Sequence, residues 1–194
     1  MMNTSLKLAS LLVAACLWLS GCASAPQLGR ADTGSFNAAG KTVLVDYMLP
    51  VDKESTTKKQ TELRDKRLGE VHQLLLQHGF RAVSSGASTF KIRVVEGADN
   101  DITGEWTGAV GASLVIFTLG IVPAMFDYRN EFRYELWAGE KRIHLITTPA
   151  DWKKAVGLVS ISSTLSGEEA SKQKARTGAH DSVIRLWIDQ GSFE

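Results

Sequence analysis

One short stretch of the sequence carries the side-chain oxygens with which a calcium loop begins. Asp99, Asp101 and Thr103 occupy positions one, three and five of that pattern, and Gly104 occupies position six. Position twelve, where a calcium loop places a bidentate glutamate, is Val110. Because the coordination shell is incomplete, we expect a solvated turn here and no metal site.

The four histidines do not form a metal-binding or catalytic pattern. His72 and His78 are six residues apart, so they do not share a helix face as an i, i+4 pair does, and His144 and His180 belong to no motif. A nucleophile elbow, a phosphate-binding loop and a dinucleotide glycine fingerprint are also absent from the sequence. We therefore expect surface or rim histidines, no catalytic residue and no cofactor. An enzyme is the least favoured of three functional hypotheses.

The N-terminus contains both cysteines, and the second follows a secretory pattern. Lys7 precedes an apolar run over residues 8–19, and this run ends in Leu-Ser-Gly-Cys at residues 19–22. The ending resembles the lipobox of bacterial lipoproteins, in which an aliphatic residue and two small residues precede a cysteine. The resemblance implies a signal peptide over residues 1–21, cleavage before Cys22, and acylation of Cys22 with chains such as palmitate.

In the lipoproteins that this ending resembles, the cysteine thiol is diacylated. Stable anchoring needs at least two lipid chains, so a diacylated Cys22 would anchor the mature protein. The alternatives are an unlipidated signal and a transmembrane anchor, although a run of about a dozen residues is shorter than the roughly 20 that cross a bilayer core. In the sorting rule of enteric lipoproteins, an aspartate after the cysteine retains the protein in the inner membrane, and this chain has Ala23. The resemblance therefore implies the periplasmic face of the outer membrane, with the inner membrane as the alternative.

Charge and cysteine content limit the classes of protein to which the mature chain can belong. The full chain has a formal net charge of +1, and loss of Lys7 with the signal reduces it to zero, so no basic excess indicates nucleic acid. Cys16 leaves with the signal and Cys22 is lipidated, so a hydrophobic core must stabilise the fold without a disulfide. We expect the lipidated cysteine and a flexible tether over residues 22–41, then one domain over residues 42–194.

Hydrophobic periodicity predicts an α+β domain. Apolar and β-branched residues predict strands over residues 42–49, 80–83, 89–95, 130–136 and 141–147. A helix is expected from Ser55–Thr57 to His78, and a second over residues 167–189 behind a Ser166–Glu169 capping box. We expect a mixed or antiparallel sheet of about four to five strands, with two helices on one face and an apolar, Gly-rich insert.

Two uncharged segments, residues 107–126 and 155–165, interrupt this pattern. The first is long enough to cross a membrane. It could also be a buried core segment with a bent strand, or a hairpin that lies against lipid or a partner. The residues that we expect at a membrane or partner contact are Trp106, Leu114, Ile116, Phe117, Leu119, Ile121, Met125, Phe126 and Trp152.

The mature part loosely resembles small uncharacterised envelope lipoproteins of proteobacteria, through a Thr-Leu-Gly-aliphatic-Pro stretch at residues 118–123 ahead of a hairpin. That resemblance brings no known activity. We expect a non-enzymatic, membrane-anchored lipoprotein that serves as an accessory, assembly or structural subunit facing the periplasm. Its partners would be the membrane, through the lipid on Cys22, and an envelope protein or a second lipid contact. The alternative is a periplasmic binding module for a lipid or other apolar ligand.

Overall fold

The computed structural model describes residues 36–38, 40–50, 55–118, 123–156 and 161–194. The predicted signal peptide and Cys22 therefore lie outside the described residues. Leu119 and Ile121, two of the expected contact residues, lie outside them as well.

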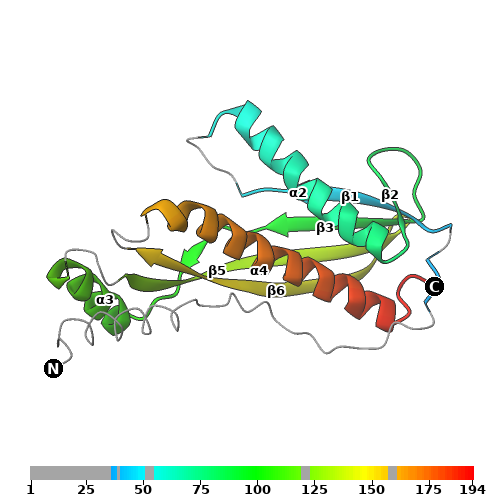
Figure 1. The fold of residues 1–194 in the computed structure, drawn as a ribbon. Coiled ribbons are helices and arrows are strands. Elements are labelled where there is room, and N and C mark those ends of the chain that lie inside the picture. The colour runs from blue at the N-terminus through cyan, green and yellow to red at the C-terminus, as the bar shows by residue number, and fades with distance from the viewer. Residues whose placement is uncertain (1–35, 39, 51–54, 119–122, 157–160) are drawn as a thin grey trace, which may run out of the picture.

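A six-stranded mixed sheet forms the centre of the fold (Figure 1). Its strands are β1 (Thr42–Met48), β2 (Arg81–Val83), β3 (Phe90–Glu96), β4 (Asn100–Asp101), β5 (Ala124–Ala138) and β6 (Lys141–Val156). β1 pairs in parallel with β2 and β3, whereas β3, β4 and β6 all run antiparallel to β5. β5 and β6 make a hairpin of 15 and 16 residues that runs the length of the molecule.

The strand β3 shows why the sheet forms where the sequence predicts it. Phe90, Ile92 and Val94 are buried on one face, and the residues between them are only half-buried. This alternation of period two places one face of the sheet against a core and the other towards water.

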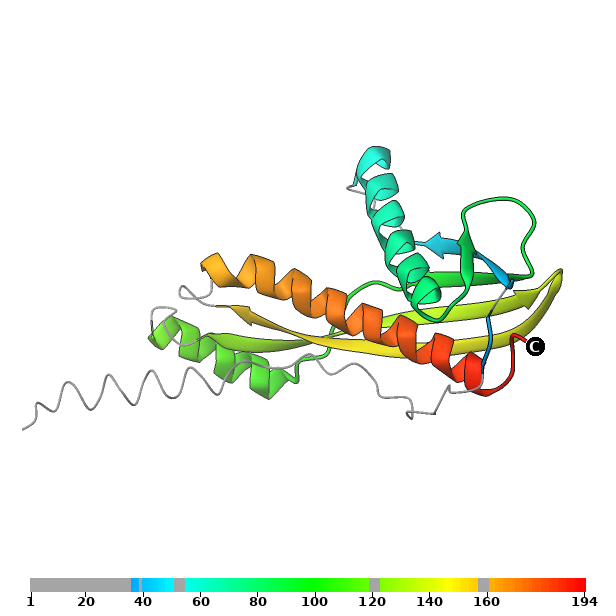
Figure 2. The same ribbon diagram turned by 45° about the vertical axis from the view of Figure 1, so that its right-hand side comes forward.

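Two helices cover that buried face (Figure 2). α2 (Thr57–Gln77) begins after Thr56, whose side chain accepts a hydrogen bond from the Lys59 amide. α4 (Ile161–Asp189) lies along the hairpin. Their inward side chains form the core with the sheet and include Val71, Leu75, Ala179, Val183 and Trp187. The predicted α+β class, with a mixed sheet and two helices on one face, is confirmed.

The first apolar insert is not a single element. Residues 105–117 form a third helix, α3 (Glu105–Phe117), and β5 begins at Ala124. The bent strand considered within this insert, at residues 119–123, lies outside the described residues except for Pro123. Among the described residues, no helix combines the length and the apolar character needed to cross a membrane.

The second insert is also divided between two elements. Ala155 and Val156 end β6, and α4 begins at Ile161. The expected cap at Ser166 is wrong because helical backbone already precedes it. No proline interrupts the chain between Ile161 and Gly167, and the helix starts six residues, more than one and a half turns, before the position that the capping pattern predicts.

An aromatic cluster closes the end of the molecule that carries the hairpin turn. The Phe36 ring lies 5.4 Å from the Phe80 ring and 6.2 Å from the Phe193 ring. Phe193 also meets Phe90 edge to face at 5.2 Å. The packed structure therefore includes Phe36, six residues before Thr42, where the sequence predicts that the domain starts.

Candidate functional site

Two buried arginines bring α2 and α4 together above the sheet. Arg176 on α4 donates two hydrogen bonds to Glu70 on α2, at 2.8 and 3.1 Å. Arg67 lies 3.6 Å from Glu70 and 3.8 Å from Glu96 on β3. These ion pairs connect both helices to the sheet, and they replace the hydration that burial removes from each charge.

We call the ion pairs of Arg67, Glu70, Glu96 and Arg176 the ion-pair layer. A tyrosine on β1 extends this layer across the sheet. The Tyr47 hydroxyl donates to Glu96 at 2.7 Å. Burial, reinforced by the neighbouring Glu96 carboxylate, raises the pKa of Tyr47 above its ordinary value. The phenol is therefore neutral and acts as a donor to a carboxylate that also faces Arg67.

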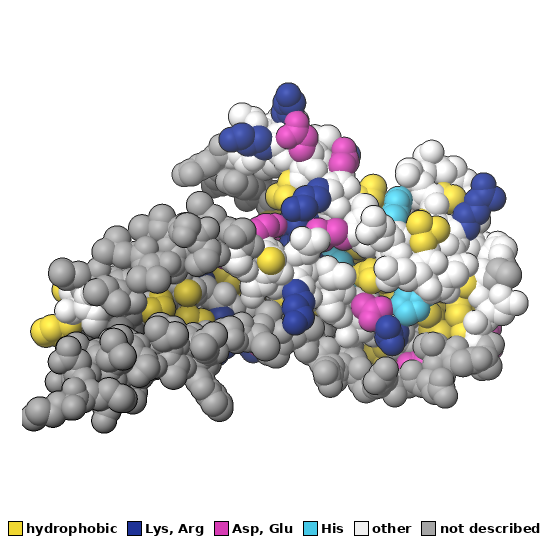
Figure 3. All heavy atoms as spheres, viewed as in Figure 1, with side chains coloured by type: hydrophobic (Ala, Val, Ile, Leu, Met, Phe, Trp, Pro, Cys, Tyr) yellow, Lys and Arg dark blue, Asp and Glu magenta, His cyan; other side chains and the backbone are white. Residues whose placement is uncertain are grey.

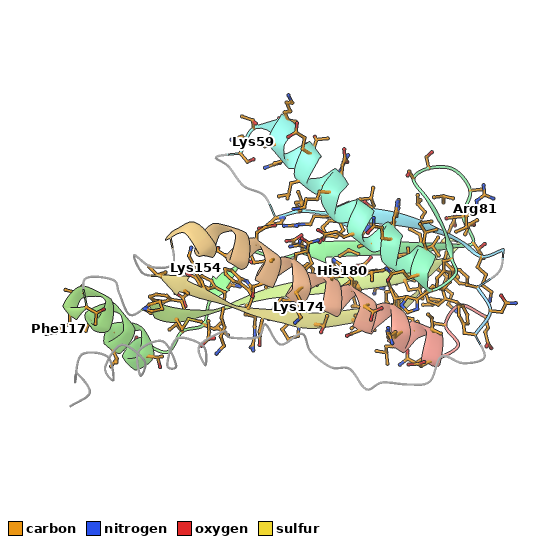
Figure 4. The ribbon with its side chains drawn as sticks, in the orientation of Figure 1. Lys59, Arg81, Phe117, Lys154, Lys174 and His180 are labelled. Carbon is orange, nitrogen blue, oxygen red and sulfur yellow. The ribbon has the colours of Figure 1, made fainter. Side chains whose placement is uncertain are left out.

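His180 is the most deeply buried polar group on α4 (Figure 4). Its Nδ1 and the Tyr134 hydroxyl share a hydrogen bond of 2.6 Å, and Phe132 packs edge to face against its ring at 5.2 Å. Burial, with Arg176 and Arg67 nearby, lowers the pKa of His180 to about 3. The expectation of a surface or rim histidine is wrong here, because His180 lies on the same helix face as the core residues Val183 and Trp187.

A small polar cavity of about 80 Å³ lies beside the ion-pair layer. It is lined by Arg67, Glu96, Asp99, Asn130, Phe132, Ala150, Trp152, Glu169, Lys172, Ala175 and Arg176. Arg67 Nε and Nη1, Asn130 Oδ1 and Trp152 Nε1 have no hydrogen-bond partner among the described residues. A polar cavity of this size has room for several water molecules, which such groups would bind.

The charges that line the cavity neutralise one another. Glu169 lies 3.7 Å from Arg67, and Asp99 lies 3.1 Å from Lys172. The lining has no serine, cysteine or histidine that could act as a nucleophile or proton shuttle. Paired charges of this kind fix the position of two helices on a sheet.

The acidic stretch that resembles a calcium loop is divided between separate partners. Asp99 accepts a hydrogen bond from the Asn130 amide at 3.0 Å, besides its ion pair with Lys172. Hydrogen bonds from the Thr103 side chain and from the Thr103 backbone amide, the latter 2.8 Å long, lower the pKa of Asp101. Within the described ranges, no cluster of three acidic, histidine or cysteine side chains could hold a metal ion.

A wider and more open hollow lies between the end of β1 and the start of α2. Its volume is about 350 Å³, and its walls mix Tyr47, Met48 and Leu49 with Asp46, Thr57, Gln60, Thr61 and Arg64. Five of its eight lining residues are thus polar or charged, unlike the mostly apolar wall of a lipid-binding pocket.

The far end of the hairpin carries α3, and apolar side chains are exposed there (Figure 3). Phe117 is 89% exposed, Ile116 is 74% exposed and Val110 is 55% exposed. Gly111 faces the sheet, since a Cβ atom there would lie 3.1 Å from that of Ala124. We call the outward face of α3, residues 109–117, the α3 tip.

The remaining expected contact residues are placed differently. Trp106 and Leu114 belong to α3, but the structure does not describe their side chains. Met125 and Phe126 are half-buried in β5. Trp152 is 4% exposed and stacks on Tyr128 at 4.5 Å, so it forms a wall of the polar cavity and not an outward surface.

Comparison with known proteins relates this chain to others by fold alone. No family model matches the chain, and no curated protein matches its sequence. A solved structure of a minor lipoprotein from Acinetobacter baumannii is 11% identical with a TM-score of 0.50, over 78% of this chain and 92% of that one. Rare lipoprotein B from Shewanella oneidensis is 9% identical with a TM-score of 0.45, over 77% of this chain and 96% of that one. The first of these likenesses supports the α+β fold described above.

Proposed function

We propose that this chain is a non-enzymatic lipoprotein of the bacterial envelope. Acyl chains on Cys22 would hold it at the periplasmic face of the outer membrane, where it would serve as an accessory, assembly or structural subunit. The observation that carries the proposal is the Leu-Ser-Gly-Cys ending of the apolar run, at residues 19–22. The fold is consistent with it, since the Acinetobacter baumannii protein of similar fold is named a minor lipoprotein.

The polar interior supports a structural role in preference to a catalytic one. Its carboxylates already face cations, as Glu96 faces Arg67 and Asp99 faces Lys172. A general acid or base needs a titratable group that can reach a substrate, and His180 is enclosed by aromatic rings.

An apolar-ligand module has less support than a structural subunit. Such a module needs a cavity of a few hundred Å³ with mostly apolar walls. The smaller cavity is lined largely by charged side chains, and most of the residues that line the wider hollow are polar or charged.

The direct test of the proposal is the chemical state of Cys22 in the mature protein. We expect mass spectrometry of the membrane-extracted chain to find an N-terminus at Cys22 that carries acyl chains, and the protein to band with the dense outer membrane in a gradient. Cys22→Ser should abolish labelling by an alkyne analogue of palmitate. An unmodified Cys22, or labelling that survives Cys22→Ser, would contradict the proposal, and banding with the inner membrane would support the alternative location.

A further inference from the structure

The α3 tip has an outward face unlike that of an ordinary surface helix. Glu105 is the one charged residue of α3, and it occupies the first position of the helix. From residue 109 to residue 117 the outward residues are apolar or small, with Val110, Ile116 and Phe117 more than half exposed. Surface helices of globular proteins normally present charged or polar side chains to water, and helices that are apolar all round are normally covered.

The single polar side chain of the α3 tip is already satisfied. Ser113 Oγ donates a hydrogen bond of 2.8 Å to the Ala109 carbonyl, one turn earlier in the same helix. The described side chains from Ala109 to Phe117 therefore offer carbon surface and no free hydrogen-bonding group to a partner. Protein interfaces add polar rims and direct hydrogen bonds to their apolar centres, whereas the hydrocarbon of a lipid leaflet requires neither.

The position of the tip relative to the tether allows it to reach the anchoring membrane. Phe36, where the described chain begins, lies in the aromatic cluster at the hairpin turn, while Phe117 lies at the opposite end of the molecule (Figure 4). β5 has 15 residues and so spans about 50 Å between these two ends. The chain from Cys22 to Phe36 also reaches about 50 Å when extended. A lipid at Cys22 and the α3 tip can therefore touch the same membrane surface.

From this geometry we propose that the α3 tip is a second lipid contact, inserted into the interfacial region of the leaflet that holds the acylated Cys22. The inference rests on the proposed lipid anchor, which would keep the tip close to the bilayer. Phe117 and Ile116 would enter the acyl boundary first, because they are the most exposed residues of the tip. A contact of this kind is apolar, so it would be insensitive to salt.

The test uses Cys22→Ser protein that is exported behind a cleavable, non-lipid signal, so that no acyl chain contributes to binding. Flotation with vesicles of phosphatidylethanolamine and phosphatidylglycerol measures the bound fraction. We expect this protein to float in low and in high salt. The double variant Ile116→Ser, Phe117→Ser should bind about tenfold more weakly or worse, as follows from losing two large apolar side chains from the contact.

Matched variants distinguish vesicle binding by the α3 tip from non-specific binding by other exposed apolar side chains. Leu76→Ser with Leu145→Ser removes two other exposed apolar side chains, 60% and 48% exposed, and should leave flotation unchanged. Ala112→Glu adds a charge to the α3 tip without removing a contact, and should reduce flotation. All variants should keep the circular dichroism and melting temperature of the parent, because every altered side chain is exposed.

Three results would overturn the inference. The parent could stay unbound to vesicles, or the tip and control variants could bind equally. Alternatively, sedimentation could show that the tip holds two copies of this chain together and does not bind vesicles. Failure of the lipid anchor is seen separately, because mass spectrometry of the wild-type protein reports the state of Cys22 directly.

Discussion

At the scale of single residues, His180 determines how the polar interior responds to acid. Its ring is enclosed by Tyr47, Phe132 and Tyr134, all from the sheet, and Arg176 lies one turn earlier on α4. A second proton on the ring would place an imidazolium among these rings and close to the Arg176 and Arg67 guanidinium groups. The folded state therefore favours the neutral histidine.

The pKa of His180 predicts a loss of stability in acid. Because its folded value is about 3 and its ordinary value is 6.5, the unfolded chain binds one more proton between these pH values. The free energy of unfolding therefore rises with pH in this window. This stabilisation is complete above pH 6.5 and is lost as the pH falls towards 3, by about 1.4 kcal/mol per pH unit.

Urea unfolding between about pH 4 and pH 6 checks this prediction. His180→Gln keeps a group that can hydrogen bond to Tyr134 but does not titrate, so its stability should depend on pH less steeply than that of the parent, by about 1 kcal/mol per pH unit. Proton titration by NMR gives an independent readout. A His180 ring that becomes protonated near its ordinary pKa, or equal slopes in the two proteins, would contradict the assignment.

The ion-pair layer shows where sequence reasoning fails at this scale. Arg67 lies four residues before the core residue Val71, and Arg176 lies four residues before His180, so helical spacing places both arginines on buried faces. Their charge nevertheless predicts exposure, because an isolated buried charge is costly. Glu70 compensates Arg176 and Glu96 compensates Arg67, and each of these pairs joins two elements that only the folded structure brings together.

At the scale of elements, Gly97 fixes the path of the chain from β3 to β4. Its amide donates to the Glu131 carbonyl at 2.8 Å, and a Cβ atom on residue 97 would lie 2.8 Å from the same oxygen. Gly69, in the middle of α2, has nothing within 4 Å of the corresponding position. Substitution by alanine should therefore have opposite effects on stability at these two positions.

We expect Gly97→Ala to destabilise the protein by about 1–3 kcal/mol, because the backbone of β5 would have to move away. Gly69→Ala should stabilise it by roughly 0.5–1 kcal/mol, since alanine is the better helix former and no atom blocks it. Urea unfolding of both variants at neutral pH measures the difference. Equal effects of the two substitutions would show that the close approach at Gly97 does not constrain the connection.

The elements that the sequence predicts are those with one solvent-exposed face and one buried face. β3 and α2 have this character, and their alternating or helical apolar positions reveal it. α3 does not, because the residues after Glu105 are mostly small or apolar all round and give no amphipathic period. The outer half of the β5–β6 hairpin is equally hard to predict from the sequence. Residues 125–129 of β5 are all half-buried, so buried and exposed positions do not alternate there.

At the scale of the whole molecule, the long hairpin separates two unlike ends. One end holds the aromatic cluster of Phe36, Phe80 and Phe193, from which the N-terminal segment departs, and the other holds the α3 tip (Figure 2). A relaxed chain of the length that joins Cys22 to Phe36 spans only about 20 Å, well below its extended reach. With both Cys22 and the α3 tip in one leaflet, the long axis of the protein should therefore lie along the membrane surface.

Shortening the segment between Cys22 and Phe36 tests this orientation. Deletion of residues 27–32 reduces its extended reach to about 28 Å, too short for a molecule standing on its tip but ample for one lying down. We expect an environment-sensitive probe at Ser113→Cys, in the acylated protein, to report a lipid environment both before and after the deletion. A variant with Gly-Ser residues in place of 27–32 controls for sequence at constant length. Loss of the lipid signal only in the deletion would indicate an upright molecule, because only then does the tip depend on a fully extended tether.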